Sequence, residues 1–103
     1  MTLTEKLTTI KTNLLTVSKS VYHYEKPASV KAPYIVWMED SCDTFGADNQ
    51  KGENQLHGTI DAYSKTEFDS IFDGIFQIPG VVLNSVQYED DTKLIHYEYE
   101  FWV

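Results

Sequence analysis

The sequence has little positive charge and a single cysteine. Of its 103 residues, 8 are Lys or Arg and 16 are Asp or Glu, which gives a formal net charge of −8. A surface with this charge repels nucleic acid phosphates and anionic membranes, so we expect no sequence-specific nucleic acid binding and no membrane binding. Because Cys42 has no second cysteine to pair with, a disulfide framework is excluded and a reducing compartment is indicated.

Targeting and membrane-spanning patterns are also missing. The first residues contain no basic stretch followed by an apolar one, so no secretory signal is predicted. No apolar run approaches the length that a membrane span requires. We therefore expect a soluble protein that is made in a cytoplasm.

The sequence carries no recognisable catalytic or cofactor motif. Its glycines match neither the dinucleotide-binding pattern nor a phosphate-binding loop. Counted from Asp48, a calcium-binding EF-hand loop would need a glycine at 53, where the chain has Glu53. We predict no intrinsic catalysis, no cofactor and no tightly bound metal.

The residues that are present suffice for one domain, 1–103. Hydrophobic residues make up 42% of the chain and aromatic residues 14%, enough for one core. Apolar residues recur at helical spacing near the N-terminus, and Thr2 with Glu5 fits a capping box that begins this helix. The residues on this apolar helix face are Leu3, Leu7, Ile10, Leu14 and Val17.

A second helix is predicted between 68 and 76. Ser64 and Glu67 offer a second capping box, and Pro79 with Gly80 ends the helix. The apolar residues expected on its buried face are Phe68, Ile71, Phe72, Ile75 and Phe76.

Alternating and β-rich segments predict strands at 33–39, 55–63, 81–89 and 93–103, with a short one at 21–24. The fold class is therefore α+β. We expect a mainly antiparallel sheet of about four or five strands with two helices packed on one face, in the order α-β-β-β-α-β-β. A long polar loop, 40–54, should join the two central strands, and we expect it to be mobile in the subunit and to order on assembly.

Two kinds of candidate site follow from this layout. His57, Asp61 and His96 are able to meet on one sheet face, together with His23, which leaves a metal site or a small intracellular enzyme using His57, Asp61 and His96 open as an alternative. Their spacing matches no metal motif, and solvated surface residues are the simpler interpretation. Leu94 and Trp102 share a strand face with charged residues, which is typical of a protein interface. The candidate interface residues are Asp43, Phe45, Asp48, Leu94, His96 and Trp102.

The layout resembles the tail-completion or tail-terminator proteins of long-tailed bacteriophages and prophages, a family of head–tail joining and minor tail proteins. The stretches 31–37 (KAPYIVW) and 57–65 (HGTIDAYSK) carry the resemblance, together with the order of the elements. The resemblance implies a non-enzymatic subunit that forms a ring at the head-proximal end of the tail tube and docks to the head connector. It implies assembly in the host bacterial cytoplasm, a place in the virion tail, and contacts made by the segment 40–54.

A third interpretation also remains open. A strongly acidic domain suits an adaptor or inhibitor that binds a basic partner protein.

Overall fold

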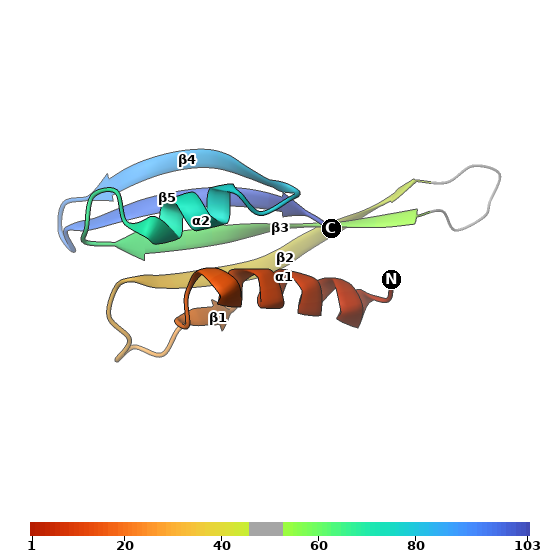
Figure 1. The fold of residues 1–103 in the computed structure, drawn as a ribbon, viewed down its shortest axis with the longest axis horizontal. Coiled ribbons are helices and arrows are strands. Elements are labelled where there is room, and N and C mark those ends of the chain that lie inside the picture. Colours follow the sequence, from red (N-terminus) through yellow and green to blue (C-terminus); the bar gives the residue numbers. More distant parts are fainter. Residues whose placement is uncertain (46–52) are drawn as a thin grey trace.

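The computed structural model of the protein describes residues 1–45 and 53–103. Two helices and five strands follow one another in the predicted order (Figure 1). Their bounds are α1 Leu3–Val17, β1 Val21–His23, β2 Tyr34–Phe45, β3 Glu53–Ser64, α2 Ser70–Phe76, β4 Val81–Glu89 and β5 Leu94–Trp102.

The strands form one sheet in the order β1-β2-β3-β5-β4. All neighbouring strands are antiparallel except β1 and β2, which are parallel. The α+β class and the mainly antiparallel sheet are thus confirmed. The last hairpin, β4–β5, joins the rest of the sheet through β5, so β3 and β5 become central neighbours although α2 and β4 separate them in the sequence.

Both helices cover the same face of the sheet, as predicted (Figure 1). The core lies between them and the strands, and its best-buried sheet residues are Ile35, Trp37, Ile60, Ala62, Tyr99 and Phe101. From the helices, Ile10, Leu14, Ile71, Phe72 and Ile75 complete the cluster. The Tyr99 hydroxyl is buried here and donates a hydrogen bond to the Phe72 carbonyl oxygen at 2.7 Å, which ties β5 to α2.

Two glycines let neighbouring elements approach closely in this core. A Cβ at Gly74 would lie 2.8 Å from Val17 Cγ1, so the glycine allows α1 to pack against α2. A Cβ at Gly58 would collide with the Met38 carbonyl oxygen and the Phe101 ring. The Phe101 ring therefore occupies the space above Gly58 that a side chain would fill.

The first helix begins as the sequence predicts. Thr2 is its N-cap, and Thr2 and Glu5 form the reciprocal hydrogen bonds of a capping box. The predicted face is buried at its centre, with Ile10 at 2% and Leu14 at 0% exposure, while Leu3 is exposed in the first turn.

The second helix is shorter than predicted, and its predicted capping box is wrong. Asp69 is the N-cap and bonds the Ile71 amide, while the Ser64 hydroxyl donates to the other oxygen of Asp69. Because the helix begins only at Ser70, Phe68 precedes it with a φ of 61° and is 90% exposed. Phe76 is 56% exposed, so neither phenylalanine belongs to the buried face.

The predicted loop 40–54 also needs correction. β2 continues to Phe45 and β3 begins at Glu53, so only 46–52 lie outside the described residues. Beyond the two backbone hydrogen bonds between Leu56 and Val103, residues 43–45 and 53–55 pair only with each other. This two-stranded extension, here called the arm, projects beyond the body of the sheet (Figure 1). Sequence reasoning missed it because the polar residues of 40–45 and 53–55 lack the alternation that marks a half-buried strand.

No helix within residues 1–45 and 53–103 has the length and apolar character needed to span a membrane.

Candidate functional site

The face of the sheet that points away from the helices, here called the open face, carries polar side chains from β3 and β5. Strand pairing places residues of these two strands directly opposite one another. Along this face the pairs are His57 with Trp102, Thr59 with Glu100, Asp61 with Glu98, and Tyr63 with His96. The register therefore sorts the two histidines and the three acidic residues of these two strands into two separate clusters.

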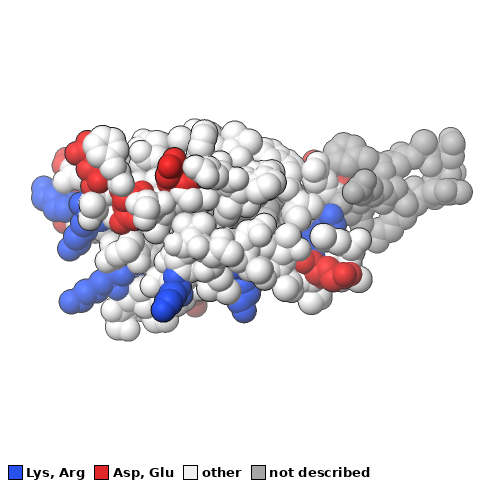
Figure 2. Space-filling model, viewed as in Figure 1, with Lys and Arg blue, Asp and Glu red and all other residues white. Residues whose placement is uncertain are grey.

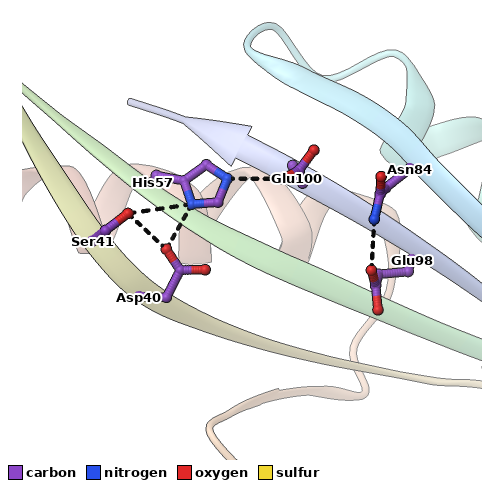
Figure 3. A network of polar contacts seen from close by, with 6 residues as sticks. All are labelled: Asp40, Ser41, His57, Asn84, Glu98 and Glu100. Carbon is purple, nitrogen blue, oxygen red and sulfur yellow. Dashed lines mark hydrogen bonds and ion pairs between the residues drawn. The ribbon is translucent and has the colours of Figure 1, made fainter.

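The first cluster, the His57 cluster, consists of Asp40, His57 and Glu100. His57 Nδ1 lies 2.6 Å from Asp40 Oδ1, and its Nε2 lies 3.1 Å from Glu100 Oε1 (Figure 3). Asp40 reaches the histidine because β2 bulges between Glu39 and Ser41, so Asp40 is an extra residue in the ladder. A histidine held between two carboxylates satisfies both contacts as a donor only when both ring nitrogens carry protons.

The electrostatics of this cluster agree with its geometry. The hydrogen bond to Asp40 is the main cause that raises the pKa of His57 above its ordinary value of 6.5, and Glu100 adds to the rise. The same bond lowers the pKa of the Asp40 carboxyl below its ordinary value. The Trp102 ring lies 4.9 Å from the imidazole, centroid to centroid, and shields one side of it. The cluster therefore stabilises the charged imidazolium form of His57 relative to the neutral imidazole.

The second cluster, the His96 cluster, consists of Asp61, His96 and Glu98, with Glu89 at its margin. His96 Nε2 lies 2.7 Å from Asp61 Oδ1, and its Nδ1 lies 3.9 Å from Glu89 Oε2. The imidazole stacks on the Tyr63 ring with 4.2 Å between centroids. Each of Asp61, His96 and Glu98 offers an atom within 4.8 Å of the atoms offered by the others. This is the group in the described part of the chain whose donors and spacing suit a metal ion.

Histidines are the only positively chargeable partners of the carboxylates in the part of the chain that the structure describes. Every ion pair there joins a histidine to an aspartate or glutamate, and none involves a lysine. Carboxylates on the open face therefore exceed the positive charge available to them.

The helix-covered side has a different character. Figure 2 shows mostly uncharged atoms across its middle, with lysine side chains along the lower edge and lysine and acidic side chains towards the ends. A groove of about 670 Å³ runs along α2 on this side, between the helix and strands β4 and β5. Its floor is the stacked pair Phe72 and Tyr97, with 4.0 Å between ring centroids, and Phe68 and Phe76 stand exposed at its rim. On the neighbouring edge strand, Val86 and Tyr88 are more than half exposed.

The residues predicted as interface candidates are dispersed. Asp43 is exposed on the arm, and the backbone of Phe45 ends β2, whereas Asp48 lies outside the described residues. Leu94, His96 and Trp102 are half-buried on the open face of β5. Leu94 and Trp102 are eight positions apart, roughly 27 Å along a strand, so the three residues form no single patch.

The metal alternative predicted from the sequence is divided between the two clusters. Asp61 and His96 come together, but His57 is six strand positions from the β3 residue that faces His96, roughly 20 Å away. His23 lies on the other side of the sheet, stacked on Trp37 and 2.7 Å from Glu39. The expectation that three histidines share one face is therefore wrong for His23.

Sequence reasoning missed the roles of Asp40, Glu89 and Asn84. The contact between Asp40 and His57 depends on a bulge that leaves no pattern in the sequence. The position of Glu89 beside His96 depends on how β4 pairs with β5. Asn84 lies at a second irregularity of the sheet, between Leu83 and Ser85. Its side-chain amide donates a hydrogen bond of 2.7 Å to Glu98 Oε1 (Figure 3). The alternation of polar residues in 57–61 and 94–102 was the available signal for the open face.

A scan against models of known protein families finds no match for this chain, and no curated protein sequence matches it significantly.

Proposed function

We propose that this chain is a structural, non-enzymatic subunit that completes a phage or prophage tail. In this role it forms a closed ring at the head-proximal end of the tail tube and joins the tail to the head connector. The order of the elements and the stretches 31–37 and 57–65 support the proposal through the resemblance described above. A net charge of −8 also suits a ring around a channel through which DNA slides without adhering.

The groove along α2 is the observation that carries the proposal of self-assembly. A phenylalanine that is 90% exposed and held at a positive φ gains nothing from solvent, and backbone strain of this kind concentrates at binding sites. Phe68 stands over a groove whose floor is aromatic. Grooves with aromatic floors and exposed apolar rims are typical of protein–protein contacts.

The arm provides a second, different surface. A two-stranded hairpin is marginally stable in water by itself, so the arm is expected to gain stability from a neighbouring molecule. A ring needs a heterologous interface, in which one patch meets a different patch on the next subunit. An arm at one end of the sheet and a groove along α2 meet that requirement, which a single self-complementary patch does not.

The partners in this proposal are further copies of the chain, the tail tube protein and the head connector protein. Assembly takes place in the host bacterial cytoplasm, and the finished subunit resides in the virion tail. No substrate and no nucleic acid sequence enters this role.

Sedimentation velocity at rising protein concentration tests the self-assembly step. Replacing an exposed aromatic at an interface typically costs about 2 kcal/mol or more of association energy, so Phe68→Ala should shift association to markedly higher concentration. Leu15→Ala is the matched control, because Leu15 is an apolar residue that is 45% exposed on α1, away from the groove. Equal association of wild type and both variants would contradict a role for the groove.

A second experiment addresses the tail itself. The protein is mixed with the tail tube protein and connector protein of the same phage or prophage and examined by electron microscopy. The proposal predicts rings that cap tube ends and stop tube growth. A protein that remains monomeric with both partners present, while tubes grow unchecked, would rule the role out.

A further inference from the structure

We propose that the His96 cluster is a metal site, in which Asp61, His96 and Glu98 bind one divalent transition metal ion of the Zn²⁺ type. This inference is independent of the proposed role in tail completion. It also departs from the expectation of no bound metal that the sequence alone supports.

The ligand atoms come from two adjacent strands whose register is fixed by the core. Asp61 and Glu98 stand directly opposite each other, and His96 lies two residues before Glu98 on the same face of β5. The neighbouring residues Ile60 and Tyr99, which point to the other face, are 0% exposed. Because those core residues prevent strand slippage, the three donors are held in one place by the fold.

Each of two ligands is oriented by a further side chain. His96 points Nε2 towards Asp61 while its other nitrogen, Nδ1, faces Glu89 at 3.9 Å, and Tyr63 stacks on the ring. A carboxylate behind the second imidazole nitrogen is the usual arrangement around a histidine that ligates metal. Glu98 accepts a hydrogen bond from Asn84 at 2.7 Å through Oε1, which leaves its other oxygen for a ligand.

Charge gives the cluster a reason to bind a cation. Acidic residues directly opposite each other on neighbouring strands destabilise a sheet, and Asp61 and Glu98 are such a pair. Glu89 adds a third carboxylate at the margin, and the described residues provide no lysine as a counterion to any of them. A divalent ion would neutralise the two ligating carboxylates and remove their repulsion.

The donor set indicates the kind of metal. One imidazole nitrogen with carboxylate oxygens suits Zn²⁺ and similar transition metals, whereas Mg²⁺ and Ca²⁺ prefer oxygen donors alone. Ligand atoms around tetrahedral Zn²⁺ stand about 3.3 Å apart, given bonds of about 2.0 Å. The three donor atoms already lie within 4.8 Å of one another, so small side-chain rotations complete the geometry. Water or another group would take the fourth position.

The test is titration of the metal-free protein with Zn²⁺ by calorimetry, followed by Co²⁺ titration monitored by visible absorption. We expect one metal ion per chain and the absorption bands of a four-coordinate Co²⁺ complex. His96→Gln should lower the affinity by more than about 100-fold, since it removes a ligand. Glu89→Gln, which removes only the orienting carboxylate, should lower it by about 10-fold.

His57→Gln is the matched control, because it replaces the other histidine of the same face while leaving the three ligands in place. Its affinity for Zn²⁺ should equal that of the wild type. Circular dichroism verifies folding, and Asp61→Asn replaces His96→Gln as the ligand variant if the latter does not fold. The proposal fails if the wild type binds no stoichiometric Zn²⁺, if binding survives loss of a ligand, or if His57→Gln weakens it equally.

Discussion

The two faces of the same sheet differ more than any other two regions of the molecule. On the helix-covered face, Ile35, Ile60, Tyr99 and Phe101 are completely buried. On the open face, the polar residues of β3 and β5 that alternate with Ile60, Tyr99 and Phe101 are half-buried, and the histidines among them pair laterally with carboxylates. Because side chains alternate along a strand, β3 and β5 each supply stability on one face and polar chemistry on the other.

The two tryptophans provide the largest test of this comparison, since each lies on a different face. Trp37 is 2% exposed in the core, so Trp37→Ala should cost about 3–5 kcal/mol of unfolding free energy. Trp102 is half-buried against His57, so Trp102→Ala should cost about 1 kcal/mol and leave the fold intact. Urea unfolding followed by circular dichroism measures both. Equal losses would show that Trp102 belongs to the core.

A pair of adjacent residues on β3 should show the next largest difference. Gly58→Ala forces a Cβ into the Phe101 ring and the Met38 carbonyl, and overpacking of this kind costs about 1–3 kcal/mol. Thr59→Ala, one residue further and on the open face, should cost less than about 1 kcal/mol. Denaturation midpoints of the two variants measured side by side check the order. If Gly58→Ala is the milder change, the packing described for Phe101 is wrong.

The His57 cluster on the open face predicts a pH dependence of stability. The pKa of His57 is raised in the folded protein, so its contribution is complete below 6.5 and is lost as the pH rises through the folded pKa. The pKa of Asp40 is lowered, so its contribution persists above 3.8 and is lost as the pH falls through its folded pKa. The excess melting temperature of wild type over His57→Gln should therefore be greatest near about pH 5 and should shrink by about pH 9.

Thermal melts of both proteins across this pH range are the measurement. If the difference in melting temperature instead grows as the pH rises towards alkaline values, His57 does not stabilise the fold as a cation between two carboxylates.

The smallest expected effect has the opposite sign. In metal-free protein kept in chelator, Glu98→Gln should raise the unfolding free energy by about 0.5 kcal/mol, because it removes the repulsion between Glu98 and Asp61. The glutamine oxygen still accepts the hydrogen bond from Asn84. Chemical denaturation of wild type and variant is the check, and a clear loss of stability would mean that the opposed carboxylates do not repel.

Much of the helix-covered face could be predicted from the sequence. The spacing of Ile10 and Leu14 predicted the buried face of α1, and the alternation within 55–63 predicted the strand β3. These patterns repeat over many residues, so a local deviation does not obscure them. The position of Phe68 was predicted wrongly, because the start of a helix is decided by its cap and the cap is Asp69 rather than Ser64.

The open face was less predictable, and the reason is register. The sequence indicates that His57, Asp61, His96 and Glu98 share a face, but which of them meet depends on how β3 aligns with β5 across the intervening α2 and β4. One register brings Asp61 to Glu98, and a shift by two residues would bring it to His96 or Glu100 instead. Contacts across strands that are distant in sequence leave no local pattern.

The bulge at Asp40 has a consequence for how the chain tolerates changes in length. Glu39 pairs with Gly58 and Ser41 with His57, so a deletion of Asp40 would let the ladder close into a regular one with every pairing retained. The protein would lose one carboxylate from His57 and little else. A single residue deleted between Tyr34 and Glu39 would instead reverse the facing of the side chains between the deletion and the bulge, which include Trp37 when the deletion precedes it. The codon for Asp40 is thus one whose loss the sheet should tolerate better than the loss of a codon nearer the start of β2.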